Sequence, residues 1–99
     1  MLRHIVSWKL TGEDVAEVDA QVERIASDLE SLVGRIPEIL SLRVVRNVVN
    51  LGTNFDAAVI ADFEDAAALE TYILHPAHVD VAGYLKSVTA ERACVDFIL

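Results

Sequence analysis

The sequence predicts one α+β domain, in which a four-stranded antiparallel sheet carries its helices on one face. Its length of 99 residues suits a single domain and is too short for two. Segments that alternate apolar and polar residues, as strands do, are mixed with segments whose apolar residues recur every three or four positions, as in helices. Their order along the chain is strand, helix, strand, strand, helix, strand.

The first half of the chain contains the clearest patterns. Residues 2–10 alternate, and one face of the predicted strand holds Leu2, His4, Val6, Trp8 and Leu10. A capping segment at 11–14 precedes apolar residues at helical spacing from Val15 to Ile36, which predicts one long helix that Gly34 and Pro37 end. The acidic opposite face of this helix is interpreted as a solvated surface.

The second half predicts a hairpin, two short helical segments and a last strand. Strands over residues 39–49 and 55–63 flank a turn at 50–54. Asp65 caps a short helix with an inner face of Leu69, Tyr72 and Ile73, which Pro76 ends, and a further helix follows from about residue 78 to residue 90. In the final strand we expect one face, toward the helices, to hold Ala93, Val95 and Phe97, and the other to hold Cys94, Asp96 and Ile98.

This order is the ferredoxin-like βαββαβ arrangement, with both helical layers on the same sheet face. The face left uncovered is then too apolar to remain in water alone, since it holds Ile5, Val45, Val49, Ala58, Ile60, Cys94 and Ile98. Burying it favours pairing with a second copy, so we expect a homodimer through the sheet face opposite the helices. We expect Lys9 to lie on the same uncovered face as Asp62 and Asp96 and to pair with one of them, either across the sheet or across the dimer interface.

Composition narrows the function. No apolar run approaches the roughly 18 residues of a membrane span, and a net charge of −8 opposes binding to nucleic acid or anionic lipid. The N-terminus has no signal-peptide pattern, so we expect a cytoplasmic protein. Cys94 is the single cysteine, which excludes an internal disulfide and a thiolate zinc cage.

Five segments in a fixed order resemble the stress-responsive dimeric α/β barrel family. They are Arg-His-Ile-Val-Ser-Trp-Lys-Leu at 3–10, Ile-Pro-Glu-Ile at 36–39, Phe63 followed by Asp65 and Leu69, Tyr-Ile-Leu-His-Pro-Ala-His at 72–78 and Val-Asp-Phe at 95–97. The resemblance implies that two ferredoxin-like protomers pack their sheets face to face as a dimeric α+β barrel. Many members are uncharacterised or known as stress-induced, while one plant branch consists of polyketide cyclases that use neither a metal nor an organic cofactor. That branch resembles this chain at His4, Tyr72 and His78.

The same three residues converge on the interior between helices and sheet. His4 shares a strand face with Val6 and Trp8, so we expect a mostly apolar cavity that could take a small ligand, lined by Val6, Trp8, Tyr72, Val81, Tyr84 and Leu85. His78 is the candidate general base, because imidazole titrates near neutral pH, and His4 or Tyr72 would hydrogen-bond a substrate oxygen.

Plainer interpretations stay open. His78 can cap a helix or bond a carbonyl, His4 can be a satisfied core histidine, Tyr72 can be ordinary core, and bulky Trp8 can fill the cavity. Ligand binding without turnover is a further alternative.

Other chemistries have weaker support. His75-x-x-His78 with Asp80 nearby offers metal ligands, but the bend at Pro76 prevents a one-face helical motif, so no metal site is predicted. His75 is assigned to the bend itself. Cys94 has no neighbouring base, and neither a Gly-x-Ser-x-Gly elbow nor a phosphate loop occurs.

Overall fold

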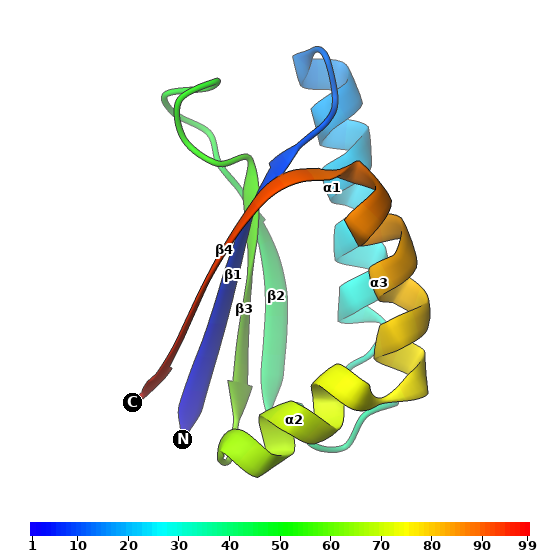
Figure 1. The fold of residues 1–99 in the computed structure, drawn as a ribbon, viewed down its shortest axis with the longest axis vertical. Helices are drawn as coiled ribbons and strands as arrows, with labels where there is room; N and C mark the ends of the chain where they lie inside the picture. The colour runs from blue at the N-terminus through cyan, green and yellow to red at the C-terminus, as the bar shows by residue number, and fades with distance from the viewer.

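A computed structural model describes all 99 residues and has the predicted two layers (Figure 1). The elements in chain order are β1 (Leu2–Leu10), α1 (Val15–Glu30), β2 (Ser41–Arg46), β3 (Ala57–Phe63), α2 (Ala66–Leu74), α3 (Pro76–Val88) and β4 (Thr89–Ile98). The strands form one antiparallel sheet in the order β2-β3-β1-β4. All three helices lie on the same side of this sheet, which confirms the ferredoxin-like prediction.

The core fills the space between the sheet and the helices. On β1 the predicted face is buried as Leu2, Val6, Trp8 and Leu10, with His4 buried among them. Helix α1 contributes a matching stripe of Val18, Val22, Ile25 and Leu29. Because both faces that meet here are apolar, burying them stabilises the arrangement of helices on sheet. None of the helices is long and apolar enough to cross a membrane.

Helix α1 is shorter than its apolar spacing predicts. It ends at Glu30, with Ser31 as its C-cap, rather than near residue 36. Leu32 and Ile36 are still fully buried, but they reach the core from turns around Gly34, whose φ of 86° is in the left-handed region. Helical spacing continued past the end of the helix because tight turns can bury the same positions.

The other element boundaries also shift. Strand β2 ends at Arg46, so Val49 lies in the following loop and does not belong to the uncovered sheet face. Pro76 does not merely end α2, since it is the first residue of α3. Proline fits there because the first turn of a helix leaves its amide protons without helical partners.

The faces of β4 are opposite to the prediction. In the β1–β4 register His4 lies opposite Asp96 and Val6 opposite Cys94, and residues opposite one another point to the same side of a sheet. Cys94, Asp96 and Ile98 therefore lie on the helix side, while Ala93, Val95 and Phe97 lie on the uncovered face. The prediction failed because it assumed that the more apolar side of the strand faces the helices.

The uncovered face is apolar, as predicted, but Ala93, Val95 and Phe97 take the place of Val49, Cys94 and Ile98 on it. Its apolar residues are Ile5, Val45, Ala58, Ile60, Ala93, Val95 and Phe97. Arg3 and Asp62 form an ion pair on it at 2.8 Å, and the hydrogen bond from Arg3 holds the pKa of the Asp62 carboxyl below its usual range. Lys9 instead donates to the Gly52 carbonyl oxygen and forms no ion pair with Asp62 or Asp96 within the protomer.

Candidate functional site

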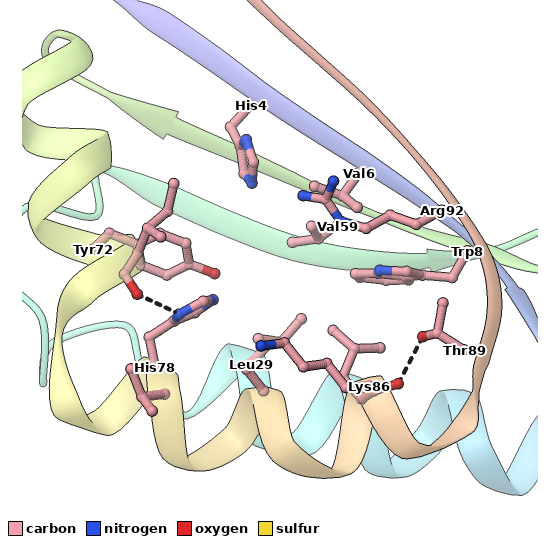
Figure 2. A pocket seen from close by; sticks show the side chains of 14 residues that line it. His4, Val6, Trp8, Leu29, Val59, Tyr72, His78, Lys86, Thr89 and Arg92 are labelled. Carbon is pink, nitrogen blue, oxygen red and sulfur yellow. Dashed lines mark hydrogen bonds between the residues drawn. The ribbon is translucent and has the colours of Figure 1, made fainter.

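An open cavity of about 340 Å³ lies between the sheet and helices α2 and α3 (Figure 2). Apolar residues form most of its walls: Val6 and Trp8 from β1, Val59 from β3, Leu29 from α1, Ile73 from α2, and Val79, Ala82 and Leu85 from α3. Trp8 forms part of the wall and is almost fully buried, but it does not fill the space. The volume and mainly apolar lining are those of a small-molecule site.

His4 presents one ring nitrogen to this cavity and uses the other to bind Asp96. Its Nδ1 lies 2.5 Å from the Asp96 Oδ1, and a carboxylate oxygen only accepts, so Nδ1 is the donor. Nε2 points into the cavity (Figure 2). The ring also packs edge-on against Phe63 and Tyr72, with centroid distances of 6.4 Å for each. Its orientation is thus fixed by Asp96 and by aromatic packing.

His78 is held in the same way from the opposite wall. Nδ1 donates to the Ile73 carbonyl oxygen at 3.0 Å, which leaves the lone pair of Nε2 directed to the cavity (Figure 2). Burial lowers the pKa of His78, the hydrogen bond to Ile73 raises it, and the charges of His4 and Lys86 lower it further. The net shift is downward, so His78 is a neutral base at pH 7.

Tyr72 lies beside His78 with 4.4 Å between the ring centroids, and it contacts Phe63 at 5.0 Å. The side chain is almost fully buried, yet its hydroxyl forms no hydrogen bond within the chain and points to the cavity (Figure 2). Burial raises the pKa of Tyr72 to about 12, so the hydroxyl keeps its proton and is available as a donor.

The remaining predicted residues divide into two groups. Leu85 lines the cavity as expected, whereas Val81 and Tyr84 do not. Tyr84 instead packs under the Arg24 guanidinium, 3.9 Å from its ring centroid, because this side of α3 faces α1. His75 lies at the bend, as expected, where its Nδ1 accepts from the Ala77 amide at 3.0 Å and caps α3.

One set of potential metal ligands is brought together, although not the set considered from the sequence. The ligand atoms of His4, Cys94 and Asp96 lie within 4.8 Å of one another. The His4–Asp96 hydrogen bond already satisfies two of the three, and the pKa of the Cys94 thiol is raised by burial and by the neighbouring Asp96 charge. The arrangement therefore needs no ion to explain it.

Four polar residues of the site escaped the sequence-based prediction, namely Lys86, Thr89, Arg92 and Asp96. Asp96 was assigned to the wrong face of β4, and Arg92 lies on the same helix-facing side of that strand as Asp96. Lys86 follows Leu85 on α3 and lines the cavity with Val79 and Ala82 at helical spacing. The register of β4 against β1 was the missing information for Asp96 and Arg92, and no local pattern supplies it.

Several solved structures share the fold. A dimeric protein of unknown function from Bacteroides fragilis is 28% identical, with a TM-score of 0.88 and coverage of 99% of this chain and 95% of that one. A dimeric ferredoxin-like protein from Thermobifida fusca, also of unknown function, is 26% identical with a TM-score of 0.83, covering 99% and 90%. These neighbours are dimers, which supports a homodimer here.

Two enzymes have the same fold at lower identity. A hydroxynitrile lyase from Passiflora edulis is 17% identical with a TM-score of 0.82, covering 99% of this chain and 92% of that one. SnoaB, a cofactor-independent oxygenase from Streptomyces nogalater, is 16% identical with a TM-score of 0.69, covering 99% and 91%. At these identities the likeness shows the fold alone.

Sequence comparison gives the family. An uncharacterised protein of Streptomyces coelicolor is 33% identical over 81 residues, which are 79% of this chain and 79% of that protein. The model of the stress responsive A/B barrel domain (Dabb) matches residues 2–99. The match extends over the strand with His4, the helices with Tyr72 and His78, and the strand with Asp96, so the chain belongs to the stress-responsive A/B barrel domain family.

Proposed function

We propose that this protein is an enzyme that moves a proton on a small, largely apolar, oxygen-bearing ligand bound in the cavity. The observation that carries the proposal is the anchoring of His78. Its Nδ1 donates to the Ile73 carbonyl, so the neutral ring offers Nε2, as a base, to the cavity. The lowered pKa of His78 keeps this base free of a proton at neutral pH.

His4 and Tyr72 fit the role of groups that bind the reacting oxygen. When His78 Nε2 removes a proton from a carbon next to a carbonyl, the electron pair of the broken C–H bond moves toward the carbonyl oxygen. The Tyr72 hydroxyl donates to that oxygen as its charge grows. Nε2 of His4 accepts from an enol hydroxyl or, once protonated, donates to the oxygen, with Asp96 stabilising the protonated ring.

The open cavity favours this proposal over a purely structural role. A core histidine and tyrosine would be packed by side chains, whereas Tyr72 keeps an unpartnered hydroxyl at the surface of an apolar cavity. The fold also supports catalysis in the Passiflora edulis lyase and in the cofactor-independent oxygenase SnoaB. The resemblance of His4, Tyr72 and His78 to the polyketide-cyclase branch points to the same class of proton transfer.

Deuterium uptake tests the proposal without knowledge of the natural substrate. Acetophenone in deuterated buffer has one exchangeable carbon position, and we expect the wild type to accelerate exchange there, as followed by proton NMR. His78→Gln should reduce the rate acceleration at least about 100-fold, since a general base contributes a rate factor of this order. His75→Asn is the matched control, because it changes a neighbouring histidine outside the cavity and keeps a capping side chain.

A ligand screen separates catalysis from binding alone. Aryl ketones that raise Tm in the wild type and in His78→Gln, but exchange at equal rates with both, would show that the cavity binds without turnover. The proposal would then be wrong. Equal exchange with folded wild type and with buffer alone would also contradict it.

We propose further that the homodimer forms through the uncovered sheet face. The support is the apolar surface of that face, on which Val95 is 61% and Phe97 39% exposed in the single protomer. Such a surface on a small domain marks an interaction site, and a symmetric pair buries it on both copies.

A further inference from the structure

The charge of the cavity is opposite to that of the protein. The chain carries 16 acidic and 8 basic residues, yet none of the residues that line the cavity is an aspartate or glutamate. Lys86 and Arg92 line it instead as cations, beside the neutral ring of His78 and the His4 ring that is bound to Asp96. Positive groups that gather in a mainly apolar hollow create a local field that attracts anions, even when the net charge is −8.

Neither Lys86 nor Arg92 is paired with a carboxylate in the chain, although the Arg92 guanidinium lies close enough to the Cys94 thiol to act on its pKa. Arg3, Arg24 and Arg46 all form ion pairs with aspartates, whereas Lys86 and Arg92 form none. Figure 2 shows their side chains entering the cavity from two walls, Lys86 from α3 and Arg92 from β4. The charge of Lys86 acts on His78, which places its field inside the site. Both cations are therefore available to a ligand.

The apolar wall beside these cations limits what the anion can be attached to. Arg92 lies directly opposite Trp8 in the β1–β4 register, and Leu85 and Val59 complete this end of the lining. The hydroxyl of Thr89, also in the lining, is already used as a donor to the Leu85 carbonyl at 2.6 Å. A bare inorganic anion would leave the apolar wall unused, while a neutral apolar molecule would make no use of the two cations.

We propose that the ligand of this cavity is a small aromatic or aliphatic acid, whose carboxylate binds Lys86 and Arg92 while its apolar body lies against Trp8. This rests on the proposed function only in taking the cavity as the ligand site. The guanidinium of Arg92 and the ammonium of Lys86 bind the carboxylate, and Trp8, which lies directly opposite Arg92 on the neighbouring strand, contacts the apolar body. The 340 Å³ of the cavity suits a single ring or a short chain.

A matched pair of probes tests the proposal, namely 4-phenylbutanoate and its neutral analogue 4-phenylbutanamide. We expect the acid to bind the wild type about tenfold more tightly in NMR titrations at low salt, and the preference to shrink in 0.5 M salt. Arg92→Gln and Lys86→Gln should each reduce it about threefold, because both side chains are solvent-accessible and their ion pairs are partly screened. The double variant should bind acid and amide alike, with unchanged affinity for the amide.

Arg35→Gln is the control, since it removes the same charge from an exposed turn outside the cavity and should keep the full preference. Three results would overturn the proposal: equal affinity of the wild type for acid and amide, a preference that persists in the double variant, or no saturable binding of either probe. The assay does not depend on turnover. A preference that is retained in His78→Gln, together with absent deuterium exchange, would therefore reject only the proton-transfer role.

Discussion

A histidine acts as a directional base when one ring nitrogen is already engaged, and His4 and His78 both meet this condition. His4 uses Asp96 and His78 uses the Ile73 carbonyl, so in each ring Nδ1 is the donor and Nε2 is left for the cavity. The partners differ in a way that matters. The Asp96 carboxylate is charged, whereas the Ile73 carbonyl is neutral, so the two rings are anchored by partners of different charge.

The titration of His78 provides the first prediction. We expect its pKa to lie below the usual value of about 6.5, because burial outweighs the hydrogen bond to Ile73. Lys86→Gln should raise it toward the usual value by removing a positive charge. Titration of the Cε1 proton by NMR measures both, with His75→Asn and His4→Asn to assign the signals. A His78 pKa above 6.5, or one unaffected by Lys86→Gln, would contradict the expected electrostatics.

The same shift has a consequence for stability. Because the pKa of His78 is lower in the folded than in the unfolded chain, the unfolded state binds more protons as pH falls. The contribution of neutral His78 is fully present above about pH 6.5 and is lost as pH falls through that value toward the folded pKa.

At the scale of elements, two glycines lie in different surroundings, one in a turn and one within a helix. Gly12 joins β1 to α1, and an added Cβ there would lie 2.8 Å from both the Val18 Cγ2 and the Val18 backbone nitrogen. Gly83 lies within α3, where an added Cβ would meet nothing within 4 Å. A side chain at position 12 would therefore clash with Val18, whereas position 83 has room for one.

We predict opposite effects of alanine at these positions. Gly12→Ala should lower the free energy of unfolding by about 1–3 kcal/mol, because either Val18 or the turn must move. Gly83→Ala should raise it by about 0.5–1 kcal/mol, because alanine loses less chain entropy in a helix. Urea unfolding at one fixed protein concentration measures both. Equal effects of the two substitutions would show that the contact at Gly12 is relaxed at little cost.

The sequence predicted those elements whose two sides differ clearly. Strand β1 and the first part of α1 each have one apolar side, and both were confirmed together with the positions of His4 and Trp8. Strand β4 has apolar residues on both sides, so alternation alone could not tell which side faces the helices. Which side of β4 faces the helices depends on the register of β4 against β1. The alternation of residues within β4 therefore could not place Asp96 and Arg92 at the site.

At the scale of the whole molecule, acidic, basic and apolar residues gather in three different regions. Acidic residues dominate the outer helix surface, basic groups line the cavity, and apolar residues gather on the uncovered face of the sheet. Val95 and Phe97, rather than Cys94 and Ile98, lie on that face of β4, which favours it as the proposed dimer interface. In the proposed homodimer through that face, the cavity lies on the helix side of each protomer.

A single charge on the uncovered face should disrupt the dimer. Val95 lies opposite Ile5 on that face, and Val95→Glu introduces the charge twice in a symmetric pair. Losing about 1.5 kcal/mol of burial per valine weakens association by at least about 100-fold, so light scattering should show a monomer at micromolar concentration. Val15→Glu serves as the control, because it adds the same charge to an exposed valine in the first turn of α1, where the helix dipole accepts it. A Val95→Glu protein that remains dimeric, or a wild type that is monomeric, would require the apolar face to be covered in some other way.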